Sequence, residues 1–223
     1  MSFFRANISE PFDGPHQDQA IARAGTNIEE ANRAMIMIHG RGASAESIIT
    51  LSEHFKHTED MVFVAPQASG HTWYPFSFLA PPAQNQPGIN SGLQAIHNLV
   101  NELNEEGIPN THIYILGFSQ GACLASEYVA RHPDKYGGLF ALSGGLIGDS
   151  INIDSYEGDL QNTPIFLGCS DVDPHIPKAR VDETEAVLQS LNGDVAKKIY
   201  SGMGHLVNED EINEINRILS ATL

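Results

Sequence analysis

Short apolar runs alternate regularly with longer amphipathic stretches along this chain, and this alternation limits the folds that it can adopt. The apolar runs have four or five residues, which is too short for a helix and suits a buried strand. They lie at residues 34–38, 61–64, 112–116, 138–142 and 164–167. Because these runs are almost continuously apolar, they favour parallel strands that are covered on both faces. A more polar run at 196–200 indicates a strand nearer an edge of the sheet.

Helical patterns occupy the segments between the apolar runs, at residues 44–57, 90–106, 120–132, 177–191 and 209–219. In residues 90–106, Leu93, Ile96 and Val100 recur at helical spacing, and Gly107 is expected to end the helix. Strands that alternate with helices predict an α/β fold with a mostly parallel central sheet and helices on both faces. We expect residues 1–223 to form a single domain, with an antiparallel edge strand around residues 19–23.

The length and charge of the chain exclude several classes of partner. A chain of 223 residues can bury a sizeable core without disulfides or metals. Its 12 basic and 28 acidic residues give a net charge of −16. This balance argues against nucleic acid, whose affinity depends on Lys and Arg contacts to phosphate, and against anionic membrane surfaces. No apolar run approaches the ~18 residues of a membrane span, so we expect no stable membrane association.

The N-terminus and the cysteines predict the cellular compartment. The first residues lack the apolar segment of a secretory signal. The two cysteines, Cys123 and Cys169, do not form a metal-binding spacing. We therefore expect a cytoplasmic protein with reduced thiols and with no metal or cofactor.

Residues Gly117–Gly121, with the sequence G-F-S-Q-G, match the pattern G-x-S-x-G at the junction of a predicted strand and a predicted helix. A sharp strand-to-helix turn strains the backbone of the central serine and lifts its hydroxyl above the sheet. Glycines on either side give the neighbouring chain room to approach. The alternative is a serine that only caps the helix in a glycine-rich turn. The context favours Ser119 as a nucleophile on a turn like that of the α/β-hydrolase fold.

A serine nucleophile needs a base, and in this fold an acid and then a histidine follow the serine along the chain. The histidines after Ser119 are His132, His175 and His205. His132 lies late in the nucleophile helix and is expected to be a helix C-terminal residue. His205 lies in a glycine-containing turn between the last strand and the last helix, and we expect it to be the base.

The acid should follow the predicted strand at 164–167, where Asp171 and Asp173 are the two candidates. Its task is to hold the tautomer of the imidazole and to stabilise the imidazolium. Asp173 precedes a Pro-x-x-Pro turn and is our choice. Asp171 is the alternative, and its other role would be to cap or hydrogen-bond that turn.

Two backbone amides are expected to form an oxyanion hole. Acyl transfer places negative charge on the carbonyl oxygen of the substrate, and fixed N–H groups can meet that charge. One amide should belong to Gln120, the residue after the nucleophile. The other should come from the turn His39–Gly42, with Arg41 as the choice. His39 is expected to be a structural hydrogen-bonding residue. The alternative is an ordinary glycine-rich turn between a strand and a helix.

These motifs together resemble the phospholipase/carboxylesterase family, which includes acyl-protein thioesterases and small bacterial carboxylesterases. The matching segments are His39–Gly42, Gly117–Gly121, Asp173–Pro177 and Gly202–His205, and the resemblance spans roughly residues 30 to 223. It implies a single-domain α/β-hydrolase fold without a large lid. It also implies Ser119, Asp173 and His205 as a catalytic triad, with the amides of Arg41 and Gln120 as the oxyanion hole.

The irregular stretch 65–87 looks like the family's loop beside the acyl pocket. Trp73 and Tyr74 are the residues in it that we expect to bind substrate, and its aromatic content suits a modest acyl group. The expected activity is hydrolysis of small-molecule carboxylic esters with short to medium acyl chains, through an acyl-enzyme. The alternatives are a thioesterase or lysophospholipase on the same triad and, more remotely, a non-catalytic ligand-binding protein.

One position departs from the family pattern. Acyl-protein thioesterases usually carry H-G-L-G-D where this chain has H-G-R-G-A, and the cation Arg41 puts a lipidated protein substrate in doubt. A guanidinium at this position could pair with a carboxylate or phosphate near the reacting ester. The sequence leaves the oligomeric state open, with a homodimer as one option.

Overall fold

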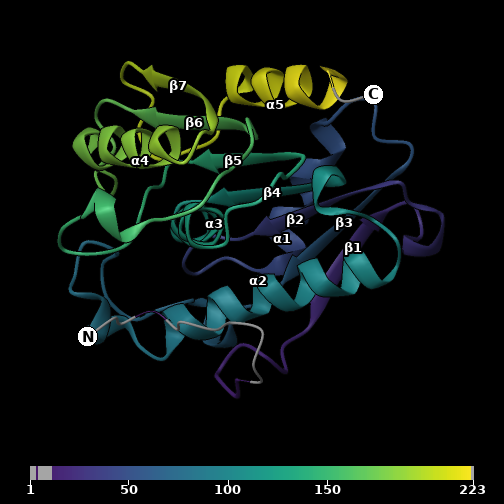
Figure 1. Cartoon of the computed structure of the whole chain (residues 1–223), viewed down its shortest axis with the longest axis horizontal. Helices are drawn as coiled ribbons and strands as arrows, with labels where there is room; N and C mark the ends of the chain where they lie inside the picture. The colour runs from purple at the N-terminus through teal and green to yellow at the C-terminus, as the bar shows by residue number, and fades with distance from the viewer. Residues whose placement is uncertain (1–3, 5–11, 222–223) are drawn as a thin grey trace.

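A computed structural model of the chain describes residue 4 and residues 12–221, and in this part of the chain the strands form one seven-stranded sheet (Figure 1). The strand order is β1-β3-β2-β4-β5-β6-β7. β1 pairs with β3 in the antiparallel sense, and every other neighbouring pair is parallel. The strands are β1 (Ile21–Gly25), β2 (Arg33–Ile38), β3 (Met61–Pro66), β4 (Ile113–Phe118), β5 (Gly138–Leu142), β6 (Pro164–Ser170) and β7 (Asp194–Tyr200).

This sheet confirms the predicted α/β architecture. The antiparallel edge strand expected around residues 19–23 is β1, which begins two residues later. The more polar run at 196–200 lies in β7, which forms the other edge of the sheet. Strands β2 and β3 are buried along their whole length, as their continuous apolar runs predicted.

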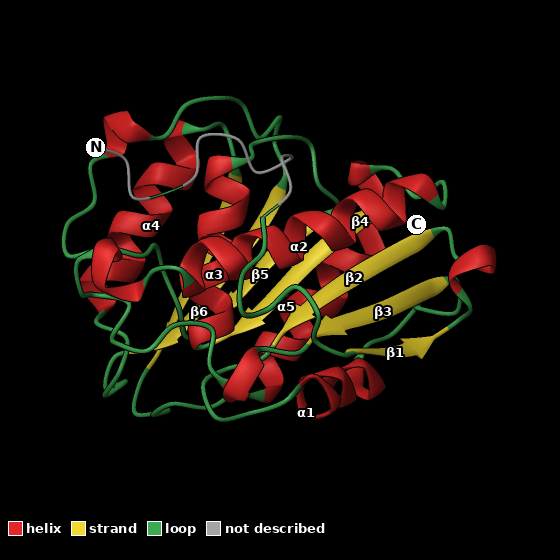
Figure 2. Cartoon of the chain, turned by 90° about the horizontal axis from the view of Figure 1, so that it is seen from below, coloured by secondary structure: helices red, strands yellow, loops and turns green. Residues whose placement is uncertain are grey.

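Five α-helices of the described residues cover the two faces of the sheet (Figure 2). They are α1 (Ala45–Ile49), α2 (Gly88–Glu105), α3 (Gln120–Arg131), α4 (Lys178–Ser190) and α5 (Glu209–Ala221). The apolar side chains divide into two clusters, one under α2, α3 and α4 and the other under α1 and α5. Successive side chains of β2 point to opposite faces of the sheet, so Ile36 belongs to the first cluster and Met35 and Met37 belong to the second.

The helix expected at residues 44–57 is interrupted. α1 ends at Ile49, and a 3-10 helix follows over Thr50–His54. The hydroxyl of Thr50 donates to the carbonyl oxygen of Ser47 at 2.9 Å. A hydroxyl that bonds the backbone three residues earlier competes with the regular helical ladder, so the chain tightens here.

The carboxyl ends of the parallel strands carry the predicted site residues. Arg41 follows β2, Ser119 follows β4, Asp173 follows β6 and His205 follows β7. In open α/β sheets, ligands bind at this end of the strands. Parallel pairing therefore gathers four segments that lie far apart in the sequence at one edge of the sheet.

Candidate active site

Ser119 lies on a strained turn between β4 and α3. Its backbone has φ 56° and ψ −119°, which is outside the regions that L-residues commonly occupy. Its amide donates to the carbonyl oxygen of Leu142 on β5 at 2.9 Å, which anchors the turn to the neighbouring strand. Such a conformation costs of order 1–3 kcal/mol and persists only where the surrounding structure imposes it.

The two glycines of the motif allow this turn because other backbone atoms pass close to them. A Cβ on Gly117 would lie 2.3 Å from the carbonyl oxygen of Gly121. A Cβ on Gly121 would lie 2.1 Å from the carbonyl oxygen of Ile38, at the end of β2. Both distances are far below van der Waals contact. Glycine at 117 therefore lets the turn from β4 into α3 close, and glycine at 121 lets α3 approach the end of β2.

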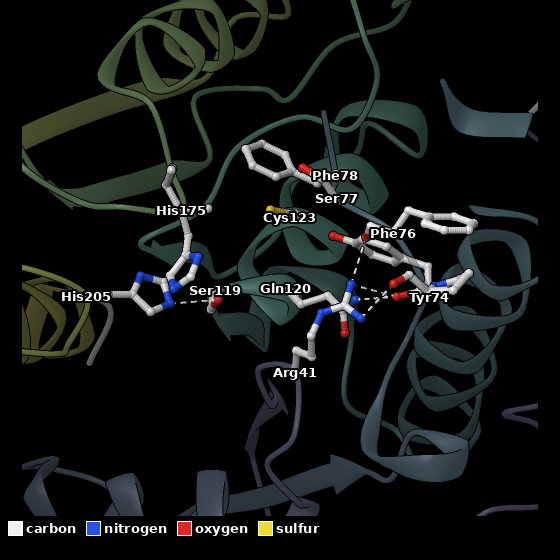
Figure 3. A pocket seen from close by; sticks show the side chains of 12 residues that line it. Arg41, Tyr74, Phe76, Ser77, Phe78, Ser119, Gln120, Cys123, His175 and His205 are labelled. Carbon is white, nitrogen blue, oxygen red and sulfur yellow. Dashed lines mark hydrogen bonds between the residues drawn. The ribbon is translucent and has the colours of Figure 1, made fainter. Parts of the chain in front are cut away.

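The side chains of Ser119, His205 and Asp173 form one chain of hydrogen bonds. The Nε2 atom of His205 lies 2.9 Å from the Oγ of Ser119 (Figure 3). The Nδ1 atom of His205 lies 2.8 Å from the Oδ2 of Asp173. The imidazole is 19% exposed and the Asp173 side chain is fully buried. A buried carboxylate on Nδ1 fixes the tautomer that leaves Nε2 free to accept the serine proton.

The buried Asp173 carboxylate is held in its charged form. Burial alone would raise the pKa of Asp173, but the hydrogen bond from His205 and two backbone amides lower it below its ordinary value. These amides belong to His175 and Ile176, which donate to Oδ1 at 2.8 and 3.0 Å. Both oxygens of the carboxylate are therefore satisfied.

The other aspartate and histidine residues considered from the sequence do not join this chain of hydrogen bonds. Asp171 is exposed and accepts a hydrogen bond from the amide of Gly202 at 2.8 Å, so it ties the turn after β6 to the turn before His205. His132 caps the end of α3, where its Nδ1 lies 3.0 Å from the carbonyl oxygen of Tyr128. His39 is buried between the carbonyl oxygen of Gly40 (2.7 Å) and the amide of Ala68 (3.1 Å), as expected of a structural residue.

The amides expected to form the oxyanion hole stand at the ends of two strands. Gln120 is the first residue of α3, so its N–H has no acceptor within the helix. Arg41 follows β2 and Gly40. Within the described residues, neither amide donates to another group. A Cβ on Gly40 would lie 3.3 Å from the Cβ of Ser119, which shows how near this turn approaches Ser119.

A cavity of about 390 Å³ opens beside Ser119. One wall is the segment 74–78, and the opposite side carries His205 (Figure 3). Ser119 and Gln120 lie between them. Tyr74 was expected to contact substrate, and it does line the cavity.

Trp73 requires a correction, because it does not line this cavity. Its side chain is fully buried, and its Nε1–H donates to the carbonyl oxygen of His39 at 2.9 Å. Its ring lies 5.2 Å from the ring of His39. The indole thus supports the turn after β2 from behind, because a buried indole N–H needs an acceptor and this carbonyl supplies one.

Sequence reasoning missed His175 as a residue of the site. It lines the cavity, and its ring packs edge-on against that of His205 with 4.8 Å between centroids. Phe118 lies against His205 as well, at 5.0 Å. The position of His175, two residues after Asp173, was the signal available in the sequence.

The described residues contain no group of three or more His, Cys, Asp or Glu side chains that could hold a metal ion. In the same part of the chain, no helix is both long and apolar enough to cross a membrane.

The sheet order and the serine turn at the carboxyl end of β4 define the fold as that of the α/β-hydrolases. A family model described as phospholipase/carboxylesterase matches residues 19–223, and the chain belongs to this family. Membership of this family, together with the names of the similar proteins, identifies the protein as an ester-cleaving hydrolase.

Similar proteins agree with this assignment. Acyl-protein thioesterase 1 of Kluyveromyces lactis is 30% identical over 90% of this chain and 96% of its own length. Acyl-protein thioesterase 1 of Saccharomyces cerevisiae is 28% identical over 90% and 97%. The crystal structure of a phospholipase/carboxylesterase from Dyadobacter fermentans is 41% identical, with a TM-score of 0.89 over 93% of this chain and 99% of that one.

Proposed function

We propose that this protein is a serine hydrolase that cleaves small-molecule carboxylic esters with short to medium acyl chains through an acyl-enzyme intermediate. The observation that carries the proposal is the hydrogen-bonded chain from the strained Ser119 through His205 to the buried Asp173. A nucleophile, a base and a group that orients the base are thereby aligned within hydrogen-bond distance.

In the first half of the reaction, the Oγ of Ser119 attacks the ester carbonyl while Nε2 of His205 accepts the hydroxyl proton. The carbonyl oxygen becomes an oxyanion that accepts hydrogen bonds from the amides of Arg41 and Gln120. Asp173 stabilises the imidazolium that has formed. The intermediate then collapses, the C–O bond to the alcohol breaks, and His205 returns its proton to the leaving oxygen.

In the second half, water replaces the alcohol. His205 accepts a proton from the water, which attacks the acyl-Ser119 ester to give a second tetrahedral intermediate at the same two amides. Collapse releases the carboxylic acid and returns the proton to Ser119.

The dimensions of the cavity support a short to medium acyl group. Phe78, which is nearly buried, and Cys123, which is fully buried, both line this cavity. Figure 3 shows these side chains on the far side of Ser119 from His205. A cavity of about 390 Å³ is at the small end of the range for ligand pockets.

Thioester hydrolysis is a second candidate, because relatives that align over nine-tenths of this chain are named acyl-protein thioesterases. The same triad and oxyanion hole would serve it, since only the leaving atom changes from oxygen to sulfur. A lysophospholipase on the same triad is the other alternative. We also propose a cytoplasmic location with reduced thiols; Cys123 and Cys169 are both unpaired and buried.

A fluorophosphonate probe tests the proposal directly. We expect stoichiometric labelling that mass spectrometry localises to Ser119 and that prior incubation with an ester substrate delays. Purified protein should then be assayed with p-nitrophenyl esters of two to twelve carbons, acyl-CoAs and lysophospholipids. Neither labelling nor turnover in any of these assays would mean a ligand-binding protein and would overturn the proposal.

A further inference from the structure

Residues 74–76, the first part of the cavity wall 74–78, lie outside the helices and strands. Its backbone groups find their partners on the side chains of other segments. The amide of Phe76 donates to the Oδ1 of buried Asn85 at 2.8 Å. The amide of Trp73 donates to the Oε1 of Gln120 at 2.9 Å, and the Nε2 of Gln120 donates to the carbonyl oxygen of Tyr74 at 2.8 Å. Side chains therefore determine the shape of this wall.

Arg41 supplies most of the bonds to the carbonyl oxygens of the wall. Its guanidinium donates to three successive carbonyl oxygens, those of Tyr74 (2.8 Å), Pro75 (2.9 Å) and Phe76 (2.7 Å) (Figure 3). A guanidinium is planar and carries donors in a fixed fork, so three bonds to one strip of backbone define its orientation closely. A lysine ammonium could not span three carbonyl oxygens in the same way.

The charge of Arg41 is not used in an ion pair with any described carboxylate. The cavity lining also contains no Asp or Glu, although the chain carries 28 of them. The dipoles of the three carbonyl groups take the place of a counter-ion. The guanidinium is therefore engaged in holding backbone, and a carboxylate or phosphate on the substrate would have to compete with these bonds.

Arg41 and Gln120 share a second property, which rests on the function proposed above. They are the two residues whose amides we assign to the oxyanion hole, and the side chains of both bind the same wall at Tyr74. The two residues whose amides would stabilise the oxyanion are therefore hydrogen-bonded, through their side chains, to the wall that would confine the acyl chain.

We propose that the Arg41 side chain is a positioning residue that fixes the acyl-pocket wall 74–76 relative to the oxyanion hole and thereby sets the preference for short acyl chains. With the wall held, a short acyl group fits with its carbonyl oxygen at the two amides. Without the guanidinium, the wall relaxes outward, so short acyl groups lose their alignment while longer ones gain room.

The test measures kcat and KM of Arg41→Leu and Arg41→Lys on p-nitrophenyl butyrate and decanoate. We expect the ratio of kcat/KM for butyrate over kcat/KM for decanoate to fall at least fivefold in Arg41→Leu, mainly because kcat on butyrate falls. The ratio for Arg41→Lys should lie between those of Arg41→Leu and the wild type. Millimolar methylguanidine should restore much of the ratio in Arg41→Ala. A role confined to stability would not produce this rescue.

Arg217→Leu is the matched control, because Arg217 is an exposed arginine on α5 whose ion pair is with Glu214. It should leave the acyl-length profile unchanged. Thermal unfolding of each variant shows that folded proteins are compared. An unchanged profile in folded Arg41→Leu would overturn the proposal.

A matched pair of esters, p-nitrophenyl butyrate and the p-nitrophenyl monoester of succinic acid, separates the wall from recognition of a charged substrate. We expect Arg41→Leu to lower kcat/KM on the two by similar factors. A loss at least tenfold larger on the anionic ester would overturn the proposal in favour of direct anion binding. Absence of esterase activity in the wild type would instead count against the proposed function itself.

Discussion

At the scale of single residues, the orientation of His205 is fixed from several directions. Asp173 holds its Nδ1, Ser119 lies at its Nε2, and the rings of Phe118 and His175 pack against it. Precise placement of a base is worth more than its chemical identity alone, because the proton must move within a hydrogen bond during the attack. We therefore expect the site to respond to substitution as a unit.

Ser119→Ala and His205→Ala should each remove nearly all turnover on p-nitrophenyl esters, and the double variant should be little slower than either single variant. The reason is that loss of either partner disables the same proton transfer, so the effects do not add. Steady-state kcat of the three variants provides the measurement. Losses in kcat that multiply would show that the two residues act independently.

Asp173→Asn should lower kcat by on the order of 10⁴, as the corresponding exchange does in serine proteases, because an amide in place of the carboxylate favours the wrong tautomer of the imidazole. Asp171→Asn is the matched control. Asp171 is exposed and contacts the amide of Gly202, so its loss should change kcat by less than tenfold. If Asp171→Asn were the inactive variant, the acid would be misassigned.

Thiol reagents should leave activity intact, although Cys123 lines the cavity. Burial raises the pKa of the Cys123 thiol to about 12 and that of the Cys169 thiol to about 11. At neutral pH almost no thiolate is present to react. Esterase activity after incubation with iodoacetamide, with mass spectrometry of both cysteines, provides the check. Rapid alkylation with loss of activity would contradict the buried positions.

At the scale of elements, the junction of β2, β4 and α3 is the most tightly constrained part of the fold. The first turn of α3 lies against the carbonyl oxygen of Ile38 through Gly121, and the strained Ser119 begins that helix. Close backbone contact at this point determines how Ser119 stands relative to the amide of Gln120 and the turn after β2. The geometry of the site is thus a property of helix–strand packing.

Gly121→Ala should destabilise the protein by about 3 kcal/mol or more, because the new methyl group cannot be placed without moving α3 away from β2. Gly107→Ala is the control for backbone strain alone. Gly107 has φ +92° at the end of α2, and its Cβ would meet nothing within 4 Å. This variant should lose only about 1 kcal/mol. Urea unfolding measures both, and equal losses would rule out the close contact as the cause.

At the scale of the whole molecule, a buried carboxyl group couples stability to pH. Glu211, near the start of α5, accepts the amide of Asn208 through Oε2 at 2.9 Å. Its Oε1 has no hydrogen-bond partner in the described part of the chain. This oxygen lies so close to Gly168 of β6 that a Cβ added to the glycine would be 2.2 Å from it. Burial raises the pKa of Glu211 to about 7 from an ordinary value of 4.5. The folded state therefore holds a proton that the unfolded chain releases.

The stability contributed by neutral Glu211 is fully present below pH 4.5 and is lost as the pH rises through 7. Glu211→Gln stays neutral, so its free energy of unfolding relative to the wild type should rise between pH 5 and pH 8, by at most about 3 kcal/mol. Glu209→Gln, on the exposed side of the same turn, is the control and should show no such rise. Parallel stability curves for the wild type and Glu211→Gln would contradict the prediction.

Local sequence patterns predicted the strands and helices and the turns on which the candidate site residues lie. Apolar runs predicted the strands because burial on both faces of a sheet leaves no room for polar side chains. The turn at Ser119 and the order of Asp173 and His205 were readable because they depend on a few neighbouring residues and on the strand each follows. The fold brings these three side chains into one hydrogen-bonded chain.

The directions in which several side chains near the site point depend on the assembled fold. Trp73 is buried behind the wall, His175 packs on His205, and the guanidinium of Arg41 binds the carbonyl oxygens of residues 74–76. The sequence contains all three residues but not their partners. A polar side chain goes where distant backbone groups are left unsatisfied, and which groups these are is known only once the strands and loops have been assembled.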